Sequence, residues 1–191
     1  MSAQDTETAL SALKELAGQY PDEPDVLARL AISQADAGQR EEAILCAQRA
    51  LRGGSKRLKS GAQAHLHHLL GGLLRQIGQL DQAIHQLTEA TRLAPNQLEP
   101  YLDLGGTQQE RRQHTLALQT YQKAIAIAPK DPRPYFQAAL AHKACRDYQE
   151  AESKLRRAAE LAPDDLAIHR QLAALVALNL VHNRLPVSLD V

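Results

Sequence analysis

The sequence is poor in aromatic residues, which make up only 3% of its 191 residues and include no Trp and a single Phe. A core organised around large rings is therefore excluded. The apolar residues, 44% of the chain, must be packed mainly as Leu, Ala and Ile. Small and aliphatic side chains of this kind suit helices that lie close together.

The chain also lacks a surplus of either charge, because Lys and Arg together number 22 and Asp and Glu together number 22. A surface that binds nucleic acid usually needs a basic surplus or stripe, which displaces counterions from the phosphates. Nucleic acid is therefore not expected to be the main partner.

Long hydrophobic runs are absent as well. The longest run, Leu172–Leu178, is far shorter than the roughly 20 residues that span a bilayer. The first residues, Met1–Glu7, show no basic region followed by an apolar stretch, which a signal peptide would require. We therefore expect a cytoplasmic protein without membrane insertion.

Cysteine is scarce. Cys46 and Cys145 lie far apart, with no CxxC pattern and no Cys/His ligand spacing. This pattern predicts two buried, reduced thiols rather than a metal site or a redox motif.

A repeat with a fixed period is the main positive feature of the sequence. Three similar tripeptides, Leu93–Pro95, Ile127–Pro129 and Leu161–Pro163, end in prolines that are 34 residues apart. A period of this size indicates a repeat architecture. Aligned on these prolines, each repeat has places 1 to 34, and the repeats begin at Ala64, Leu98 and Pro132.

The same places carry the same kinds of side chain in each repeat. Places 20 and 27 are Ala, and place 24 between them is bulky. These residues are Ala83, Leu87 and Ala90; Ala117, Tyr121 and Ala124; and Ala151, Leu155 and Ala158. Spacings of four and three put them on one face of a helix, where the alanines let a neighbouring helix approach closely. A second amphipathic segment precedes each of these helices, so every unit is predicted to be helix, turn, helix.

This pattern resembles the tetratricopeptide repeat (TPR), a 34-residue unit of two helices. A fourth unit fits upstream, starting at Pro24, and half-repeats fit at both ends. The N-terminal half-repeat is a lone second helix with Ala9, Leu13 and Leu16 at places 20, 24 and 27, and the C-terminal one is a lone first helix.

The resemblance implies an all-α fold, a right-handed α-solenoid of tandem repeats that forms a single domain. The predicted parts are a capping helix at 5–20, repeat 1 at 24–57, an insertion at 58–63, repeats 2 to 4 at 64–97, 98–131 and 132–165, a capping helix at 166–184 and a tail at 185–191. The sequence departs from the family pattern at two turns, where Arg112 and Arg146 stand in place of the usual glycine.

In proteins of this family, the first helices line a concave groove that receives a peptide or a helix of a partner. The resemblance therefore implies a non-catalytic scaffold or adaptor with a protein ligand. The implied groove residues are His65, His68, Leu69, Glu99, Leu102, Asp103, Arg133, Phe136, Gln137, Leu140 and Lys143. Apolar residues among mixed charges suit a short amphipathic ligand. The corresponding places lack the Lys and Asn with which one TPR subfamily grips chaperone C-termini, so that ligand is not expected.

Two local features allow a more specific interpretation. The cluster His65–His68 could bind zinc together with Glu99 and Asp103, although polar histidines lining the groove are the simpler interpretation. The basic insertion at 52–61 could bind an anion, form a solvated linker, or extend the following helix by a turn from Ser55. We predict no metal site.

Catalytic patterns are absent from the sequence. The pairs Gly71–Gly72 and Gly105–Gly106 lack the preceding strand and the following Lys-Ser/Thr of a phosphate-binding loop. No nucleophile or acid pair stands in a context that suggests activation. We therefore expect neither an enzyme nor a cofactor.

The last helix suggests an alternative function. One apolar stripe, expected to pack on repeat 4, consists of Leu172, Ala173, Val176 and Leu180. A second apolar stripe consists of Ala174, Leu178, Val181 and Leu185. Because a terminal helix usually turns a polar face to water, a second stripe predicts contact with a second copy, as in a homodimer, or with a partner subunit. The tail at 187–191 would otherwise have to cover it.

Overall fold

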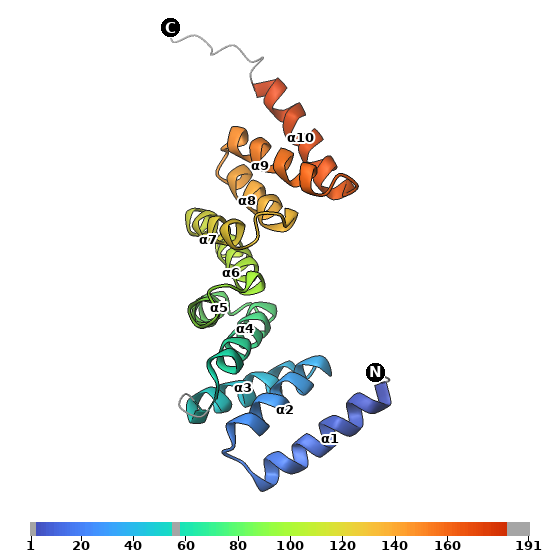
Figure 1. Cartoon of the computed structure of the whole chain (residues 1–191), viewed down its shortest axis with the longest axis vertical. Helices are drawn as coiled ribbons and strands as arrows, with labels where there is room; N and C mark the ends of the chain where they lie inside the picture. Colours follow the sequence, from blue (N-terminus) through green and yellow to red (C-terminus); the bar gives the residue numbers. More distant parts are fainter. Residues whose placement is uncertain (1–2, 55–57, 183–191) are drawn as a thin grey trace. The chain divides into compact units, whose positions relative to one another are not determined.

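A computed structural model of the chain describes residues 3–54 and 58–182 (Figure 1). Over these residues it contains ten α-helices and no strand, which confirms the all-α fold. The helices are α1 (Ala3–Gln19), α2 (Pro24–Asp36), α3 (Arg40–Gly54), α4 (Ser60–Gln76), α5 (Leu80–Leu93), α6 (Leu98–Glu110), α7 (His114–Ile127), α8 (Pro132–Ala144), α9 (Tyr148–Leu161) and α10 (Leu166–His182). Within the described residues, none of them is long and apolar enough to cross a membrane.

The chain forms two compact units, Met1–Thr107 and Gln108–Val191, and the division falls within α6. In the first unit, α2 pairs with α3 and α4 pairs with α5, while α1 packs against α2 and α3 packs against α4. In the second unit, α8 pairs with α9, α7 packs against α8, and α10 packs against α9. Helices α2, α6 and α8 begin at the first residues of their proposed repeats, whereas the division into repeats itself stays a prediction.

Buried alanines explain how the helices of a pair approach each other so closely. The alanines at places 20 and 27 of the four repeats have no exposed surface: Ala43, Ala50, Ala83, Ala90, Ala117, Ala124, Ala151 and Ala158. Between them, place 24 carries Leu87, Tyr121 or Leu155 in the last three repeats, and each is at most 1% exposed. The large side chain fills the space that the two alanines leave, as close packing requires.

The segment before α4 is partly helical. Helix α4 begins at Ser60, one turn before the proposed repeat start at Ala64, so the following helix is extended by a turn but not from Ser55. Residues 55–57 lie outside the described part of the chain. Leu58 is only 5% exposed and belongs to the core of the first unit, so the insertion is not a wholly solvated linker.

The prediction that both cysteines are buried is wrong for Cys145. Both thiols are free, but Cys145 is exposed because it directly follows α8, beyond the last buried turn of that helix. Cys46 is half-buried in α3. Burial raises the pKa of the Cys46 thiol, and the nearby Arg49 guanidinium opposes this shift.

Helix α1 packs through a face that does not carry places 20 and 27. Leu10 is 7% exposed and Ala17 packs against the core, whereas Ala9 and Leu16 at those places are exposed. The reason is that α2 lies on only one side of α1 (Figure 1). The buried face is therefore the one that meets the next helix.

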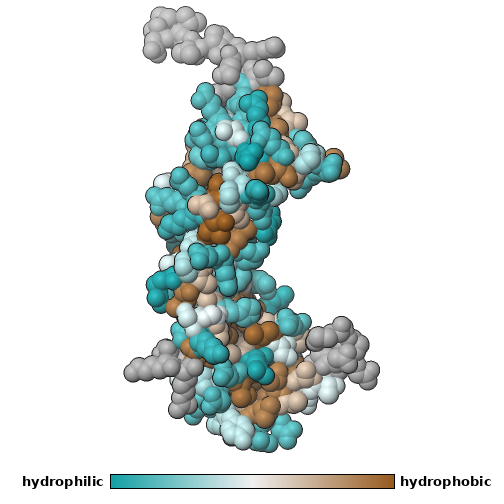
Figure 2. Space-filling view, viewed as in Figure 1, coloured by the Kyte–Doolittle hydropathy of each residue, from teal (hydrophilic) through white to brown (hydrophobic). Residues whose placement is uncertain are grey.

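Helix α10 also buries a different stripe from the one predicted. Its buried residues are Ile168 and Leu175, with Leu172 packed against them. Of the other predicted residues, Ala173 is exposed, Val176 is half-buried, and the side chain of Leu180 lies outside the described residues. Helix α10 is apolar on most sides, so its pattern offers several stripes. Hydrophobic side chains consequently reach the surface over this helix (Figure 2).

The turns inside the repeats all use a left-handed residue. Gly38 and Gly78 have φ of +75° and +77°, and the two arginines that replace the usual glycine adopt the same conformation, Arg112 with φ of +62° and Arg146 with φ of +61°. Each of these residues closes the turn between the two helices of its repeat. A side chain with a Cβ is strained there, which glycine avoids.

Replacing Arg112 and Arg146 with Gly is expected to stabilise the second unit by about 0.5–1 kcal/mol at each position. Removing the left-handed strain of about 1–2 kcal/mol outweighs the extra freedom that glycine gives the unfolded chain. The matched control is Gly78→Ala, which should destabilise the first unit by about 1 kcal/mol. Urea unfolding followed by circular dichroism measures all three changes, and a loss of stability in both glycine variants would contradict the strain.

Candidate functional site

A cleft of about 500 Å³ opens on the first helices of the first unit. It is formed by the end of α2, the turn that follows, the start of α3, the body of α4 and one residue of α6. Its lining residues are Ala35, Asp36, Gly38, Arg40, His65, His68, Leu69, Gly72, Leu73, Gln76 and Asp103. Four of the groove residues predicted from the sequence thus line one cleft: His65, His68, Leu69 and Asp103.

Asp103 connects α6 to α4 inside this cleft. Its Oδ2 accepts a hydrogen bond of 2.6 Å from His68 Nε2, and its Oδ1 lies 3.6 Å from Arg75 Nη1. Because an ionised carboxylate can only accept, the proton of this hydrogen bond belongs to Nε2 of His68. The Arg75 guanidinium lies beside Gly106, where an added Cβ would be 3.6 Å from Nη1, an ordinary van der Waals contact. The carboxylate is therefore held between two nitrogen-bearing side chains.

The rest of the cleft combines apolar surface with polar groups of both kinds. Arg40 Nε donates a hydrogen bond of 2.8 Å to Gln76 Oε1, which ties the start of α3 to the end of α4. Leu69 is half-buried and provides apolar surface. No atom lies within 4 Å of the place where a Cβ of Gly72 would stand, so this glycine keeps the cleft open. Asp36 adds a second carboxylate.

The three histidines of the cluster point in different directions. His68 faces Asp103, whereas Nδ1 of His67 donates a hydrogen bond of 2.7 Å to Gln86 Oε1 on α5. His65 is exposed at the cleft. Across the described residues, no three His, Cys, Asp or Glu side chains are grouped as metal ligands would have to be. In that part of the chain, the zinc interpretation therefore has no ligand set.

The remaining predicted groove residues of the first unit lie on α6. Leu102 is half-buried and Glu99 is exposed, and neither lines the cleft. In the second unit, Phe136 packs against the core cluster. Lys143 Nζ donates a hydrogen bond of 3.3 Å to Gln171 Oε1, which connects α8 to α10.

At the start of α8, the side chain of Arg133 forms an ion pair with Asp131. Asp131 caps this helix by accepting a hydrogen bond of 2.9 Å from the Arg133 backbone N–H, and Nη2 of Arg133 lies 2.7 Å from Asp131 Oδ2. The hydrogen bonds from the Arg133 side chain lower the pKa of the Asp131 carboxyl. Gln137 and Leu140 are half-buried on α8. The arginine thus stabilises its own helix terminus.

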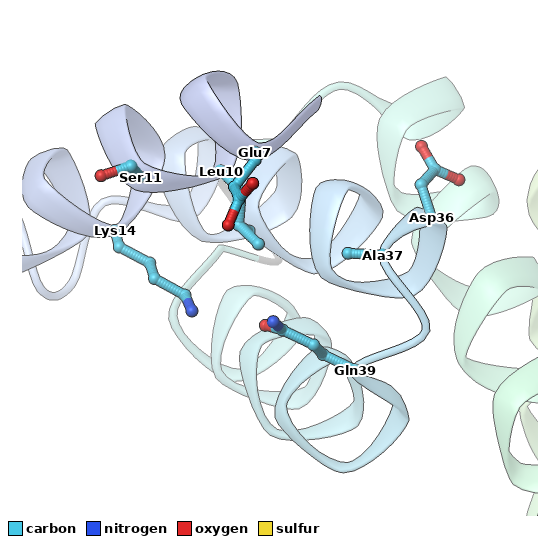
Figure 3. Close-up of a pocket in the computed structure, with 7 residues that line it drawn as sticks. All are labelled: Glu7, Leu10, Ser11, Lys14, Asp36, Ala37 and Gln39. Carbon is cyan, nitrogen blue, oxygen red and sulfur yellow. The ribbon is translucent and has the colours of Figure 1, made fainter. Parts of the chain in front are cut away.

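A second cleft, of about 580 Å³, lies between α1 and the end of α2 (Figure 3). It is lined by Glu7, Leu10, Ser11, Lys14, Asp36, Ala37 and Gln39. In the close-up, Lys14 of α1 and Gln39, which directly precedes α3, extend into the same space. The Oε1 atom of Gln39 is buried without a hydrogen-bond partner. Asp36 lines both clefts, so the end of α2 separates them.

Two sequence profiles of the tetratricopeptide repeat match the chain, one over residues 68–132 and the other over residues 135–168. Together they cover just over half of it. The chain belongs to the tetratricopeptide-repeat family. Among curated proteins, none matches the sequence significantly.

Solved TPR structures share this fold. MamA is 25% identical, with a TM-score of 0.75 over 83% of this chain and 89% of MamA. YrrB, described as a TPR protein with an unusual peptide-binding site, is 18% identical, with a TM-score of 0.78 over 88% of this chain and 84% of YrrB. The C-terminal part of a TPR repeat-containing protein from Cytophaga hutchinsonii is 19% identical, with a TM-score of 0.81 over 95% of this chain and 69% of that one.

The TPR pattern predicted cleft residues on the first helices but not those at the turn between helices. Arg40 opens a second helix, and it lines the cleft because the left-handed turn at Gly38 brings the start of α3 beside the end of α4. The turn glycine is the sequence signal that could have identified this residue. The cleft beside α1 was also missed, because it depends on how far the capping helix diverges from α2.

Proposed function

We propose that this TPR protein is a non-catalytic interaction scaffold that binds a peptide or a helix of a partner protein on its first helices. Family membership supports a protein-binding scaffold in general. YrrB is described as having a peptide-binding site, although a likeness at 18% identity supports the fold alone. The observation that carries the proposal is the cleft of the first unit, which combines apolar surface with hydrogen-bond donors and acceptors.

The chemistry of this cleft suits a peptide main chain with an apolar side chain. With Nε2 of His68 bound to Asp103, its Nδ1 remains available to a ligand N–H. The Asp36 carboxylate accepts hydrogen bonds, and the Arg40 guanidinium donates them. Leu69 offers the apolar contact. An extended peptide or the face of an amphipathic helix supplies all the matching groups.

The test is selection of peptides from a displayed library on the wild-type protein, followed by fluorescence anisotropy on the selected peptides. Leu69→Ala and Asp103→Asn are each expected to weaken binding about 10-fold or more, since truncating a central anchor costs about 1–2 kcal/mol or more. Gln82→Ala, at an exposed position of α5, should leave the affinity unchanged. Unchanged folding of each variant is checked by circular dichroism.

The other groove residues are assessed with the same peptides. Leu102→Ala, Arg133→Ala and Phe136→Ala should weaken binding more than Gln122→Ala or Lys154→Ala, which change residues of the second helices α7 and α9. Retained affinity in every first-helix variant, with a loss in the second-helix controls, would show that the ligand binds elsewhere.

A second candidate function is that of a structural subunit that contacts a second copy or a partner subunit through α10. Ala174 is exposed and Leu178 is 38% exposed, which favours this candidate. The side chain of Val181 and the residue Leu185 lie outside the described part of the chain. Loss of partner capture in Leu178→Glu would support it. The cytoplasmic location stays a prediction.

A further inference from the structure

The complete repeats show what covers the inner face of a second helix. In α3, α5 and α9, the alanines at places 20 and 27 have no exposed surface, because the first helix of the same repeat packs against them. Place 8 of the first helix provides the closest approach. Gly71 at this place lies directly against Leu87 and Ala83 of α5. A second helix without its first helix would therefore leave a recognisable apolar face uncovered.

Helix α1 is a second helix of this kind. Ala9 at place 20 is exposed, Leu16 at place 27 is 41% exposed, and Tyr20, just after the helix, is 56% exposed. Helix α2 packs on a different side of α1, through Leu10 and Ala17. Among the described residues, no helix lies over the face that carries Ala9 and Leu16.

Helix α10 is the converse, a first helix without its second helix. Place 8 is buried in every complete repeat, as Ala31, Gly71, Gly105 and Ala139. In α10 this place is Ala173, and it is exposed. Leu166, at place 1 of the same helix, is 78% exposed. The face of α10 that would meet a second helix is therefore uncovered within the described residues.

The two uncovered faces correspond to the two sides of the contact that forms inside a complete repeat. We propose that α10 of one copy packs against α1 of a second copy, as a first helix packs against the second helix of its own repeat, so that copies of the protein join head to tail. This inference does not rest on the peptide-binding cleft, which lies on other surfaces.

The side chains of the two faces are complementary in size. Pairing on the pattern of α4 and α5 places Ala173 opposite Ala9 and Leu13, as Gly71 lies opposite Ala83 and Leu87. A small residue on the first helix again meets a small and a large one on the second. Close approach of the two helices is therefore possible without a steric clash.

The ends of the pairing match in polarity and charge. In the last complete repeat, places 4 and 26 are Tyr135 and Arg157, which lie near each other on the paired helices α8 and α9. The same places across the proposed contact are His169 of α10 and Glu15 of α1, which can form an ion pair. One turn further along, the exposed Leu166 approaches Leu16 and the exposed ring of Tyr20.

The contact joins two different surfaces, so it does not close into a symmetric dimer. Each joined pair still presents one free α1 and one free α10, so further copies can add at both ends. One helix face on another is smaller than the roughly 1,200–2,000 Å² of stable interfaces, so we expect micromolar or weaker association.

The first experiment is light scattering of the full chain from about 10 μM to about 1 mM, which covers the affinities of small interfaces. The mean mass should rise from that of the 21.0 kDa monomer to several multiples of it. Leu16→Glu and Ala173→Glu each place a charge on one of the two faces, and each variant alone should stay monomeric. Both residues are exposed, so both variants should keep the wild-type helix content.

The decisive experiment mixes the two variants. A Leu16→Glu copy has an intact α10 and an Ala173→Glu copy has an intact α1, so an equimolar mixture should form dimers and nothing larger. Leu45→Glu, which changes a 59% exposed residue of α3, and Leu178→Glu, on another face of α10, should assemble like the wild type.

Three results would overturn the proposal. The first is a wild type that stays monomeric at all concentrations. Assembly of Leu16→Glu alone would show symmetric contact through α10, and a monomeric mixture would show that the faces do not pair. Peptide affinity measured on the same variants, expected to be unchanged, separates failure of this proposal from failure of the groove proposal.

Discussion

Replacing Tyr121 with Ala is expected to lower the free energy of unfolding of the second unit by about 3–5 kcal/mol, the range for truncating a buried aromatic side chain. Tyr121 stands at place 24 of α7 and is 0% exposed. Its ring fills the space between Ala117 and Ala124, which are also fully buried. Because helices packed on alanine cannot move closer together, the cavity left by truncation stays open.

The hydroxyl group of Tyr121 can be assessed separately from its ring. It donates a hydrogen bond of 2.6 Å to Gln109 Oε1. Tyr121→Phe removes the hydroxyl donor, so Gln109 Oε1 loses this partly buried hydrogen bond. The free energy of unfolding is therefore expected to fall by about 1–2 kcal/mol. Tyr20→Ala is the control, because Tyr20 is 56% exposed and its truncation should change stability by no more than about 0.5 kcal/mol.

Urea unfolding at low protein concentration, followed by circular dichroism, measures these variants. The expected order of stability is wild type and Tyr20→Ala, then Tyr121→Phe, then Tyr121→Ala. Equal stability of Tyr121→Ala and Tyr20→Ala would mean that the ring of Tyr121 is not part of a packed core.

Two adjacent glycines of α4 are expected to respond to the same substitution in opposite directions. A Cβ added to Gly71 would lie 2.6 Å from Leu87 Cγ and 3.3 Å from the Ala83 carbonyl oxygen. Leu87 is 0% exposed, and the backbone of Ala83 cannot shift without moving α5. Gly71→Ala should therefore destabilise the first unit by a net amount of about 1–3 kcal/mol, although Ala is the better helix former.

Gly72 is the matched control for Gly71. No atom lies within 4 Å of the position of its Cβ, so Gly72→Ala should stabilise the same helix by up to about 1 kcal/mol. Thermal unfolding of the two variants gives the comparison directly. Stabilisation by both substitutions would contradict the close approach of α4 to α5. Because Gly72 lines the cleft that we propose binds a peptide, Gly72→Ala should also reduce the affinity for the selected peptides.

Local signals made the repeated part of the fold predictable. Ala83 and Ala90 identify the buried face of α5 from residues of that helix alone, because helical spacing places them together. The same register brought His68 and Asp103 into one predicted groove, and the structure joins them by a hydrogen bond of 2.6 Å. Arg40 was not predictable in this way, because its place in the cleft depends on a turn and on a neighbouring helix.

The residue pattern alone predicts a series of helical hairpins with alanine-rich contacts. Which faces of the terminal helices are buried depends on tertiary packing. In α10, Leu172–Leu178 is apolar on every side, and Leu175, which belonged to neither predicted stripe, is the residue that is fully buried. In α1, Leu10 is buried and Ala9 is exposed. Burial depends on which helices lie beside a segment, and a terminal helix has a neighbour on only one side, so its own pattern cannot choose the face.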